Sequence, residues 1–509
     1  MLTINDPNVG EHVWVEGSGV GGGEQSSQPP SKIIPSHGGT DQLCPRMTIN
    51  KLPDEDLLEI FEFYMTFRLP PPFLDEDTWH TLVHVCRRWR YVVFDSPRRL
   101  DLKLLCINRR LVKTLDIWPE LPIAIHVDNW RIGQPPTVTS TDVISVLNRH
   151  RDDRVCKIFI DGVPNSLLEE LTAMSFPALI ELELASFQGD TPILPDSFLG
   201  GSVPRLRSLD LWGIPFPGIR KLLLSTRDLV TLSLGSMSNS GYFSPEAMAA
   251  ILSALTKLRS LYLNFQTPEF WAHGASRRPP VLTRVALPAL TDFDFSGNIE
   301  YLEDFVSRID APLDCIDVIF FGELVSDMPR LRDFICRTNI LQAPHRTEIY
   351  FSSFNARISL FQRKADFDFK VLNILWYTSD PQLSSLAQAC SRLLPPLPSL
   401  EHLGIYKYES EFWSSQWLKE VEDTQWMELL RPFIAVKDLA LGEAFALSIA
   451  SALQELVGEQ LTEILPALQT ISLEGFQSLD PVPDGIAKFI AARELASRPV
   501  IVHHRGREQ

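Results

Sequence analysis

The sequence predicts an α/β protein in which a short N-terminal helical segment precedes a long solenoid of strand and helix units. The first observation is a short pattern of apolar residues that recurs from about residue 164 onward. The second is that segments with helical periodicity lie between the copies of this pattern. The third is a helix-rich segment, Ile49 to Pro97, that is too small to bury its own apolar side chains well.

The recurring pattern consists of an apolar residue, two variable residues and then an apolar-x-apolar strand signal. Its eight copies are residues 176–187, 203–214, 226–237, 255–265, 287–298, 397–408, 434–445 and 465–476. The first apolar positions of the first five copies are Leu179, Leu206, Leu229, Leu258 and Leu290. They are spaced by 27, 23, 29 and 32 residues, near or just beyond the roughly 20–29 residues of a leucine-rich repeat.

Segments between the copies are expected to be helices. One begins with a capping-box pattern, Ser166 with Glu169 three residues later. Another begins with Ser244 as its N-cap. A strand and a helix at a nearly fixed period indicate a solenoid over residues 164–480, with parallel strands on the concave face and helices on the convex face.

Residues 325–395 match the repeat poorly, and we keep them in the array as irregular units. Strands are expected at 347–351 and 370–376, and a helix at 381–394.

The remaining segments flank the repeats. Residues 1–47 are rich in Gly, Ser, Pro and Gln and are predicted to be a disordered tail. Residues 48–98 form the helical segment, and residues 99–163 connect it to the repeats. This connection is expected to contain strands at 100–104, 121–127 and 155–160 and a helix at 141–149. Residues 481–509 are expected to be a C-terminal cap and tail, with His503, His504 and Arg505 in solvent.

The N-terminal helical segment opens with Leu52-Pro53, and three acids follow at the positive end of the expected helix. The apolar face of this helix consists of Leu57, Ile60, Phe61 and Tyr64. The face of the next helix consists of Trp79, Leu82, Val83 and Cys86, and Trp89 and Val93 are expected to prolong it. So small a unit should turn part of its apolar surface toward something else.

This order of residues resembles the F-box, with Leu52-Pro53 at its start and a Val-Cys-Arg-x-Trp motif, Val85 to Trp89, at its end. The resemblance implies docking to a Skp-type adaptor of an SCF ubiquitin ligase and, through the adaptor, to a cullin. The residues it assigns to adaptor binding are Leu52, Pro53, Leu57, Leu58, Ile60, Phe61, Val85, Cys86 and Trp89. A Pro-rich insertion at 68–75 lengthens the link between the helices. The alternative is a plain helical hairpin within a larger core.

The repeats resemble those of leucine-rich-repeat substrate receptors, and the whole layout resembles the large F-box families of basidiomycete fungi. That resemblance implies a receptor that holds a protein substrate on its concave face. Strand periodicity places acids and aromatic residues there, and these suit a basic partner segment. The candidate substrate-binding residues are Glu181, Glu183, Asp210, Trp212, Tyr262, Asp292, Asp294 and Tyr406. The alternative is that they form only the solvated side of a sheet.

The composition argues against several functions. The chain has 509 residues and a net charge of −17, which argues against nucleic acid and anionic membranes as partners. Its seven cysteines are odd in number and have no CxxC spacing, so neither a disulfide framework nor a zinc site is expected. No signal peptide or membrane span is recognisable. We therefore expect the protein in the cytosol, the nucleus or both.

Motifs of catalysis are not apparent. His80 and His84 have the spacing of a zinc-binding H-E-x-x-H motif, but the glutamate is replaced by Thr81, so solvated or adaptor-facing histidines are expected. We expect no enzyme, no cofactor and no metal, and a receptor that binds proteins. A repeat scaffold that acts outside any ubiquitin ligase is the competing interpretation, and an enzyme with dispersed catalytic groups is a third.

Overall fold

The computed structural model contains two compact units, one that ends at Ile60 and one that begins at Phe61. The structure describes residues 49–66, 78–106, 112, 115, 118, 120–128, 138–187, 193–215, 220–237, 243–265, 284–321, 328–338, 340, 343–352, 355–364, 367–377, 383–394, 397–408, 421–456, 460–476 and 481–505. The predicted disordered tail and the Pro-rich insertion lie outside the described residues.

The first unit contains the 3-10 helix η1 (Ile49–Lys51) and the start of helix α1 (Asp54–Thr66). The carbonyl of Pro53 accepts the first helical hydrogen bond, from the N–H of Leu57 at 3.2 Å. Three acids occupy the first turn, where the helix dipole favours negative charge. Leu57 is buried, whereas Ile60 is exposed.

In the second unit, the second predicted helix is divided into α2 (Thr78–Val85) and α3 (Arg87–Asp95). Cys86 separates them in an extended conformation, and its Sγ accepts a hydrogen bond from the N–H of Trp89 at 3.4 Å. The prediction that Trp89 and Val93 prolong one helix is therefore wrong. The reason is that the thiol of Cys86 caps a new helix by accepting one of its otherwise unpaired N–H groups.

The described residues also form a sheet of sixteen strands. The strands are β1 (Leu104–Cys106), β2 (Ile123–Asp128), β3 (Val155–Asp161), β4 (Glu181–Ala185), β5 (Ser208–Trp212), β6 (Thr231–Met237), β7 (Ser260–Phe265), β9 (Asp292–Gly297), β11 (Cys315–Phe321), β12 (Pro344–Phe351), β13 (Asn355–Lys364), β14 (Phe367–Tyr377), β15 (His402–Lys407), β16 (Asp438–Gly442), β17 (Thr470–Glu474) and β18 (Ile501–Arg505). Two short strands, β8 (Val285–Ala286) and β10 (Ile309–Asp310), pair separately.

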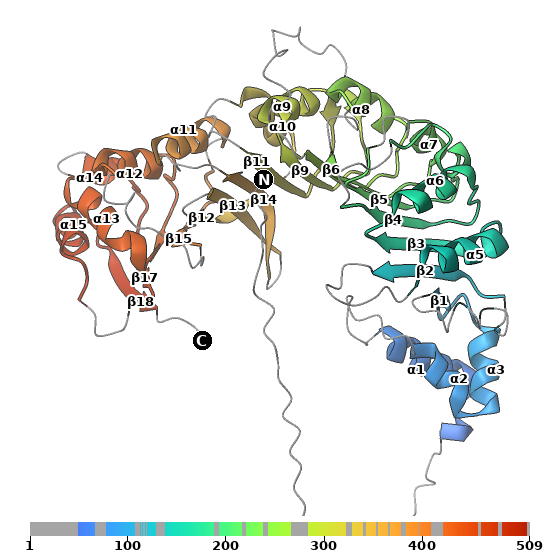
Figure 1. The fold of residues 1–509 in the computed structure, drawn as a ribbon. Coiled ribbons are helices and arrows are strands. Elements are labelled where there is room, and N and C mark those ends of the chain that lie inside the picture. The colour runs from blue at the N-terminus through green and yellow to red at the C-terminus, as the bar shows by residue number, and fades with distance from the viewer. Residues whose placement is uncertain are drawn as a thin grey trace, which may run out of the picture. The chain divides into compact units, whose positions relative to one another are not determined.

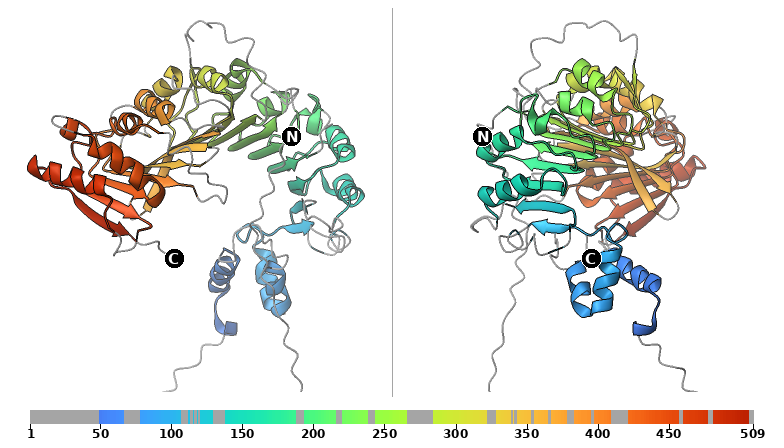
Figure 2. Two further views of the ribbon diagram at one scale, coloured as in Figure 1. Left: turned by 60° about the vertical axis from the view of Figure 1, so that its left-hand side comes forward. Right: turned by 90° about the vertical axis from the view of Figure 1, so that its right-hand side faces the viewer.

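Helices connect most of these strands and lie on one face of the sheet (Figure 1). They are α5 (Ser140–His150), α6 (Asn165–Ala173), α7 (Arg220–Ser225), α8 (Pro245–Leu252), α9 (Ile299–Val306), α10 (Pro329–Arg337), α11 (Leu383–Leu393), α12 (Asp423–Leu430), α13 (Glu443–Gln454), α14 (Gln460–Glu463) and α15 (Asp484–Leu495), with the 3-10 helix η3 (Phe198–Gly201). The two further views of Figure 2 show the same layering, with the helices along one face of the strands. The predicted fold class, a helical segment followed by a long parallel-strand α/β sheet, is confirmed.

The recurring sequence pattern corresponds to one repeated turn and strand. In each copy, the N–H of the first apolar residue bonds to the carbonyl three residues earlier, as from Leu179 to Phe176 at 3.3 Å. The leucine side chain is buried, and the following strand presents alternate residues to the helices, as Leu182 and Leu184 do. The core therefore lies between the sheet and the helices, and the other face of the sheet carries the variable residues of the pattern.

The irregular stretch contains a change of strand order. The predicted strands are present as β12 and β14, but the intervening strand β13 was not predicted. The chain passes from β11 to β12, returns through β13 and β14, and leaves β14 as the neighbour of β11. Strand β13 is antiparallel to both of its neighbours, so the sheet is parallel except at this strand.

Three other local predictions are corrected. Residues 97–101 form a turn and strand β1 begins only at Leu104. Leu100 in the turn and Leu102 after it are both buried, and this spacing imitates strand alternation. Helix α6 follows Pro164 and has no side-chain cap, so the predicted capping box at Ser166 is absent. The predicted C-terminal tail contains α15 and the last strand of the sheet, β18.

Candidate interaction surfaces

The predicted adaptor-binding residues divide into buried and accessible side chains. Leu57 and Phe61 are fully buried. The ring of Trp89 packs against that of Phe61, with 4.8 Å between their centroids, and remains half-buried. Leu57 and Phe61 thus belong to the interior of the structure, and their assignment to adaptor contact stays a prediction.

Several apolar side chains of this region do face solvent. Ile60 is 44% exposed and Val85 is 59% exposed, and Pro53 is exposed as well. The structure adds Phe63, 61% exposed, and Tyr91, 67% exposed. Leu52, Leu58 and Cys86 are half-buried. Neither Phe63 nor Tyr91 belongs to the apolar helical stripe, and aromatic residues outside that stripe were the signal that could have identified them.

Trp79 and His80 of α2 form an aromatic cluster with Trp118. The Nε1 of Trp79 donates to the carbonyl of Lys103 at 3.0 Å, and its indole packs edge-on against Trp118 with 5.4 Å between the centroids. His80 stacks on Trp79 and is buried, whereas His84 is exposed. A solvated His80 was therefore a wrong expectation. The described residues hold no group of three metal-ligating side chains, and none of their helices is long and apolar enough to cross a membrane.

On the open face of the sheet, paired residues of successive strands form a continuous row that we call the acidic row. It consists of Glu183, Asp210, Ser233, Tyr262, Asp294, Asp317 and Asn373. Glu181 and Asp292 lie in the adjacent row on the same face, two residues before Glu183 and Asp294 on their strands. The structure thus brings together seven of the eight predicted substrate-binding residues on β4, β5, β7 and β9. Tyr406 lies apart from them, on β15.

The acids of this face lie close to one another and are partly buried, and both effects raise the pKa of two of them. Burial, together with the nearby carboxylates of Asp210, Asp161 and Glu181, raises the pKa of Glu183 to about 7. Burial and then Asp317 raise the pKa of Asp294 to about 6. A cation brought close to these carboxylates would relieve their repulsion, so the acidic row suits a basic partner.

Some acids of the row already have partners within the chain. The hydroxyl of Ser233 donates to Oδ1 of Asp210 at 2.9 Å. The Oδ1 of Asp317 accepts from Nδ2 of Asn373 at 2.7 Å, and Nζ of Lys370 lies 3.0 Å from its Oδ2. These bonds fix the side chains in the middle and at the β14 end of the row.

Two predicted aromatic residues lie beside the acids. The rings of Trp212 and Tyr262 are nearly parallel, with 6.3 Å between their centroids and 25° between their planes. The hydroxyl of Tyr262 accepts a hydrogen bond from Nδ2 of Asn264 at 3.0 Å. Both rings are half-buried, which leaves flat apolar surface for contact on an otherwise polar face.

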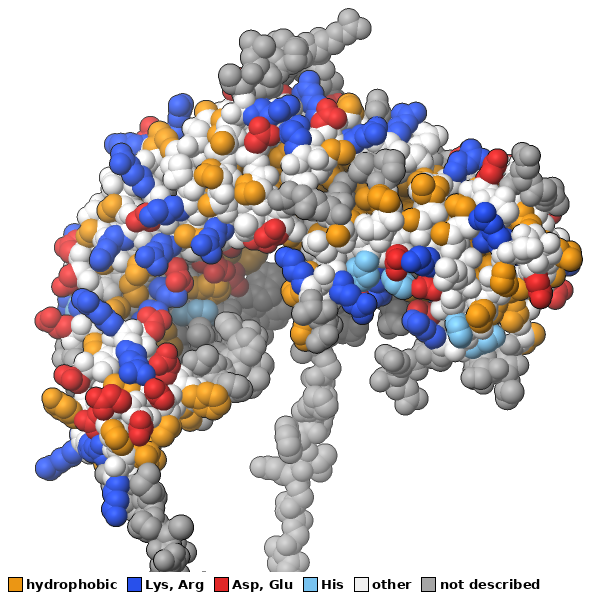
Figure 3. Space-filling view, turned by 180° about the vertical axis from the view of Figure 1, so that it is seen from behind, with side chains coloured by type: hydrophobic (Ala, Val, Ile, Leu, Met, Phe, Trp, Pro, Cys, Tyr) orange, Lys and Arg blue, Asp and Glu red, His pale blue; other side chains and the backbone are white. Residues whose placement is uncertain are grey.

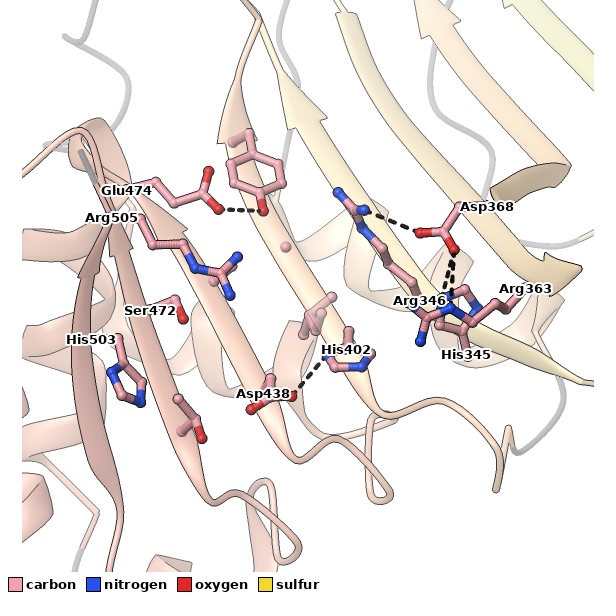
Figure 4. A pocket seen from close by; sticks show the side chains of 15 residues that line it. His345, Arg346, Arg363, Asp368, His402, Asp438, Ser472, Glu474, His503 and Arg505 are labelled. Atoms are coloured by element: carbon pink, nitrogen blue, oxygen red, sulfur yellow. Dashed lines mark hydrogen bonds and ion pairs between the residues drawn. The ribbon is translucent and has the colours of Figure 1, made fainter. Parts of the chain in front are cut away.

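Further along the open face, a pocket of about 400 Å³ is lined by residues of strands β12 to β18 (Figure 4). We call it the polar trough. Its residues are His345, Arg346, Arg363, Asp368, His402, Leu403, Gly404, Tyr406, Asp438, Ala440, Thr470, Ser472, Glu474, His503 and Arg505. Of these residues, only Tyr406 is among the candidate substrate-binding residues predicted from the sequence, because the trough depends on strand pairing between segments far apart in the chain.

Apolar side chains do not dominate the face of the molecule that Figure 3 shows. In the space-filling view of Figure 3, hydrophobic side chains are scattered among charged ones on the face that is seen. Polar and charged contacts are therefore the main chemistry that this face offers to a partner.

Comparison with known proteins finds a matching family model and several similar solved structures. The F-box-like family model matches residues 49–102. The crystal structure of the leucine-rich repeat-containing protein LegL7 from Legionella pneumophila is similar with a TM-score of 0.24 and 12% sequence identity, over 67% of this chain and 97% of that chain. None of the curated proteins compared matches the chain. The chain thus contains an F-box-like region followed by a strand-and-helix array.

Proposed function

We propose that the protein is the substrate-recognition subunit of an SCF-type ubiquitin ligase and acts in the cytosol, the nucleus or both. Residues 49–102 would dock a Skp-type adaptor and thereby a cullin, and the open face of the sheet would hold a protein substrate. The observation that carries the proposal is that the F-box-like match coincides with exposed apolar side chains, among them Ile60, Val85 and Tyr91. Large apolar side chains of this kind anchor protein interfaces.

The receptor needs no bond chemistry of its own in this proposal. It raises the effective concentration of the substrate near the transferring enzyme. The acidic row with Trp212 and Tyr262 supports a protein as the bound partner, because rigid aromatic side chains beside charged groups are typical of interface centres. A scaffold acting outside any ligase would use the same open face but would leave residues 49–102 without an adaptor.

Co-purification of the full chain with a Skp-type adaptor tests the proposal. Ile60→Asp and Val85→Asp, made separately, should each lower the recovered adaptor roughly tenfold or more, because each places a charge on an apolar anchor. The matched control is Leu447→Asp on α13, where the side chain is 70% exposed. Trp89 is unsuitable for this test, since its ring packs on Phe61 and its loss would disturb folding.

Adaptor binding that is absent from the wild-type chain, or that neither substitution weakens, would contradict the ligase proposal. The scaffold alternative would then be favoured, provided that the open face still binds a protein.

A further inference from the structure

The polar trough has a floor of small residues and two taller walls. Gly404, Ala440 and Ser472 are neighbours on adjacent strands. Ala440 and Ser472 form the floor, and the ring of Tyr406 lies over Gly404. One wall includes His402 and Asp438, which precede Gly404 and Ala440 by two positions on their strands. Because period-2 alternation sends these side chains to the same face, small residues between larger ones leave a channel across the strands.

Every carboxylate that lines the trough is engaged within the chain. Asp368 lies 3.2 Å from Nε2 of His345 and 3.4 Å from NH1 of Arg346. The Oδ2 of Asp438 lies 2.8 Å from Nδ1 of His402. The hydroxyl of Tyr406 donates to Oε1 of Glu474 at 3.2 Å. The lining carboxylates are thus already satisfied and do not call for a cationic ligand.

The donors at the other end of the trough are not engaged. Figure 4 shows Arg505, Ser472 and His503 side by side there. In strand register His503 is opposite Ser472, and Arg505 is opposite Glu474. Within the described part of the chain, the side chains of Arg505, His503 and Ser472 make no hydrogen bond or ion pair. A guanidinium, an imidazole and a hydroxyl that lie side by side, with no partner among the described residues, can together recognise an anionic oxygen group.

We propose that the polar trough binds an acidic segment of a protein partner, with a carboxylate or phosphate group at Arg505, His503 and Ser472. The segment lies over Ala440 and Ser472, where small side chains leave room for a backbone, beside the ring of Tyr406 that covers Gly404. A planar guanidinium can form two parallel hydrogen bonds to either group. This inference rests on the proposed function, because it assumes that the open face holds a protein substrate and names one chemical class of that substrate.

Synthetic peptides test the inference on the full chain. The probes are fluorescein-labelled dodecapeptides of alternating Gly and Ser with a central pair of Glu, phosphoserine or Gln residues. Their binding is measured by fluorescence anisotropy at low ionic strength, where screening is weak. The Glu and phosphoserine peptides should bind more tightly than the Gln peptide. A phosphoserine peptide that binds more tightly than the Glu peptide assigns the site to phosphate, and the reverse order assigns it to carboxylate.

Two kinds of variant locate the binding. Arg505→Ala combined with His503→Ala should weaken the anionic peptides about tenfold or more, since hydrogen bonds to charged groups are lost. Arg332→Ala, which removes an exposed cation on α10, is the charge control. Ala440→Leu should weaken the same peptides by filling the floor without changing any charge. Its bulk control is Thr231→Leu, on the open face of β6.

Unchanged binding of the anionic peptides to both trough variants would overturn the inference, as would equal binding of all three peptides to the wild-type chain. Thermal melts identify a variant that fails to fold. Because the Ala440→Leu variant and the Arg505→Ala, His503→Ala double variant perturb the trough in different ways, each one tests the result of the other. Adaptor co-purification involves none of these residues, so failure of the trough inference and failure of the ligase proposal are distinguishable.

Discussion

The indole of Trp212 occupies the space that a Cβ at Gly235 would need. An added Cβ at Gly235 would lie 2.0 Å from Cε3 of Trp212, on the neighbouring strand. Tyr406 and Gly404 repeat this arrangement within one strand, with 2.3 Å between the added Cβ and Cε2 of the tyrosine. At both sites the missing side chain of a glycine allows an aromatic ring to lie on the sheet, where it presents an apolar surface among polar residues.

Gly235→Ala should therefore displace the indole of Trp212 into solvent. The physical reason is that contacts below about 3 Å between carbon atoms are strongly repulsive, and the ring is the movable group. We expect a red shift of tryptophan emission and stronger quenching by acrylamide. The same substitution in a Trp212→Phe background should leave the emission unchanged, and an equal red shift in both backgrounds would contradict the assignment.

The regular part of the fold could be predicted from the sequence because each repeat is local. The turn before each strand and the buried positions of each strand lie within about ten consecutive residues, so apolar spacing is enough to identify them. Strand β13 was not predicted because it is an antiparallel strand within the repeat array, and its position depends on pairing with β12 and β14 rather than on apolar spacing alone. Strand β18 is short, contains two histidines, and is recognisable only from its pairing with β17.

The candidate surfaces were predictable to different degrees. The acids at Glu183, Asp210 and Asp294 could be predicted to share a face, since period-2 alternation determines the side of the sheet on which each one lies. Their alignment in one row depends on the register between neighbouring strands, and this register cannot be read directly from the spacing of the repeats. The polar trough depends on residues from His345 to Arg505, and no local pattern brings these together.

The strand register predicts different sensitivities of adjacent residues. Leu209 and Leu261 are buried, whereas Ser208 and Ser260, one residue earlier, face the open side. Leu→Ala at either leucine should lower the free energy of unfolding by about 2–5 kcal/mol through lost burial and cavity formation. Ser→Ala at either serine should change it little. Thermal and denaturant melts measure both, and equal sensitivity at adjacent positions would contradict the register.

The raised pKa of Glu183 predicts a loss of stability as the pH rises. The pKa of this carboxyl is about 7 in the folded protein and 4.5 ordinarily, so the folded state binds more protons between these values. Unfolding free energy therefore falls as the pH rises through this window and levels off above it. Glu183→Gln should raise the melting temperature relative to wild type at about pH 8 and have little effect at about pH 4.

The control for this pH dependence is Glu169→Gln, on the exposed side of α6. It should change the melting temperature equally at the two pH values. A Glu183→Gln variant that behaves like the control would show that the carboxyl ionises at its ordinary pH.

The acidic row should capture basic segments by electrostatic steering. Asp292→Lys combined with Asp294→Lys should weaken binding of a labelled Gly-Ser dodecapeptide with a central pair of lysines, measured by anisotropy at a pH above the raised pKa of Asp294, about 6. Wild-type binding should fade above about 0.15 M salt, where the Debye length is about 8 Å. Glu169→Lys with Glu170→Lys on α6 makes the same change in net charge away from the row and should leave binding nearly intact. An equal loss of peptide affinity in both double variants would mean that only the net charge of the protein matters. Peptide binding that depends neither on salt concentration nor on either double variant would mean that basic segments bind elsewhere.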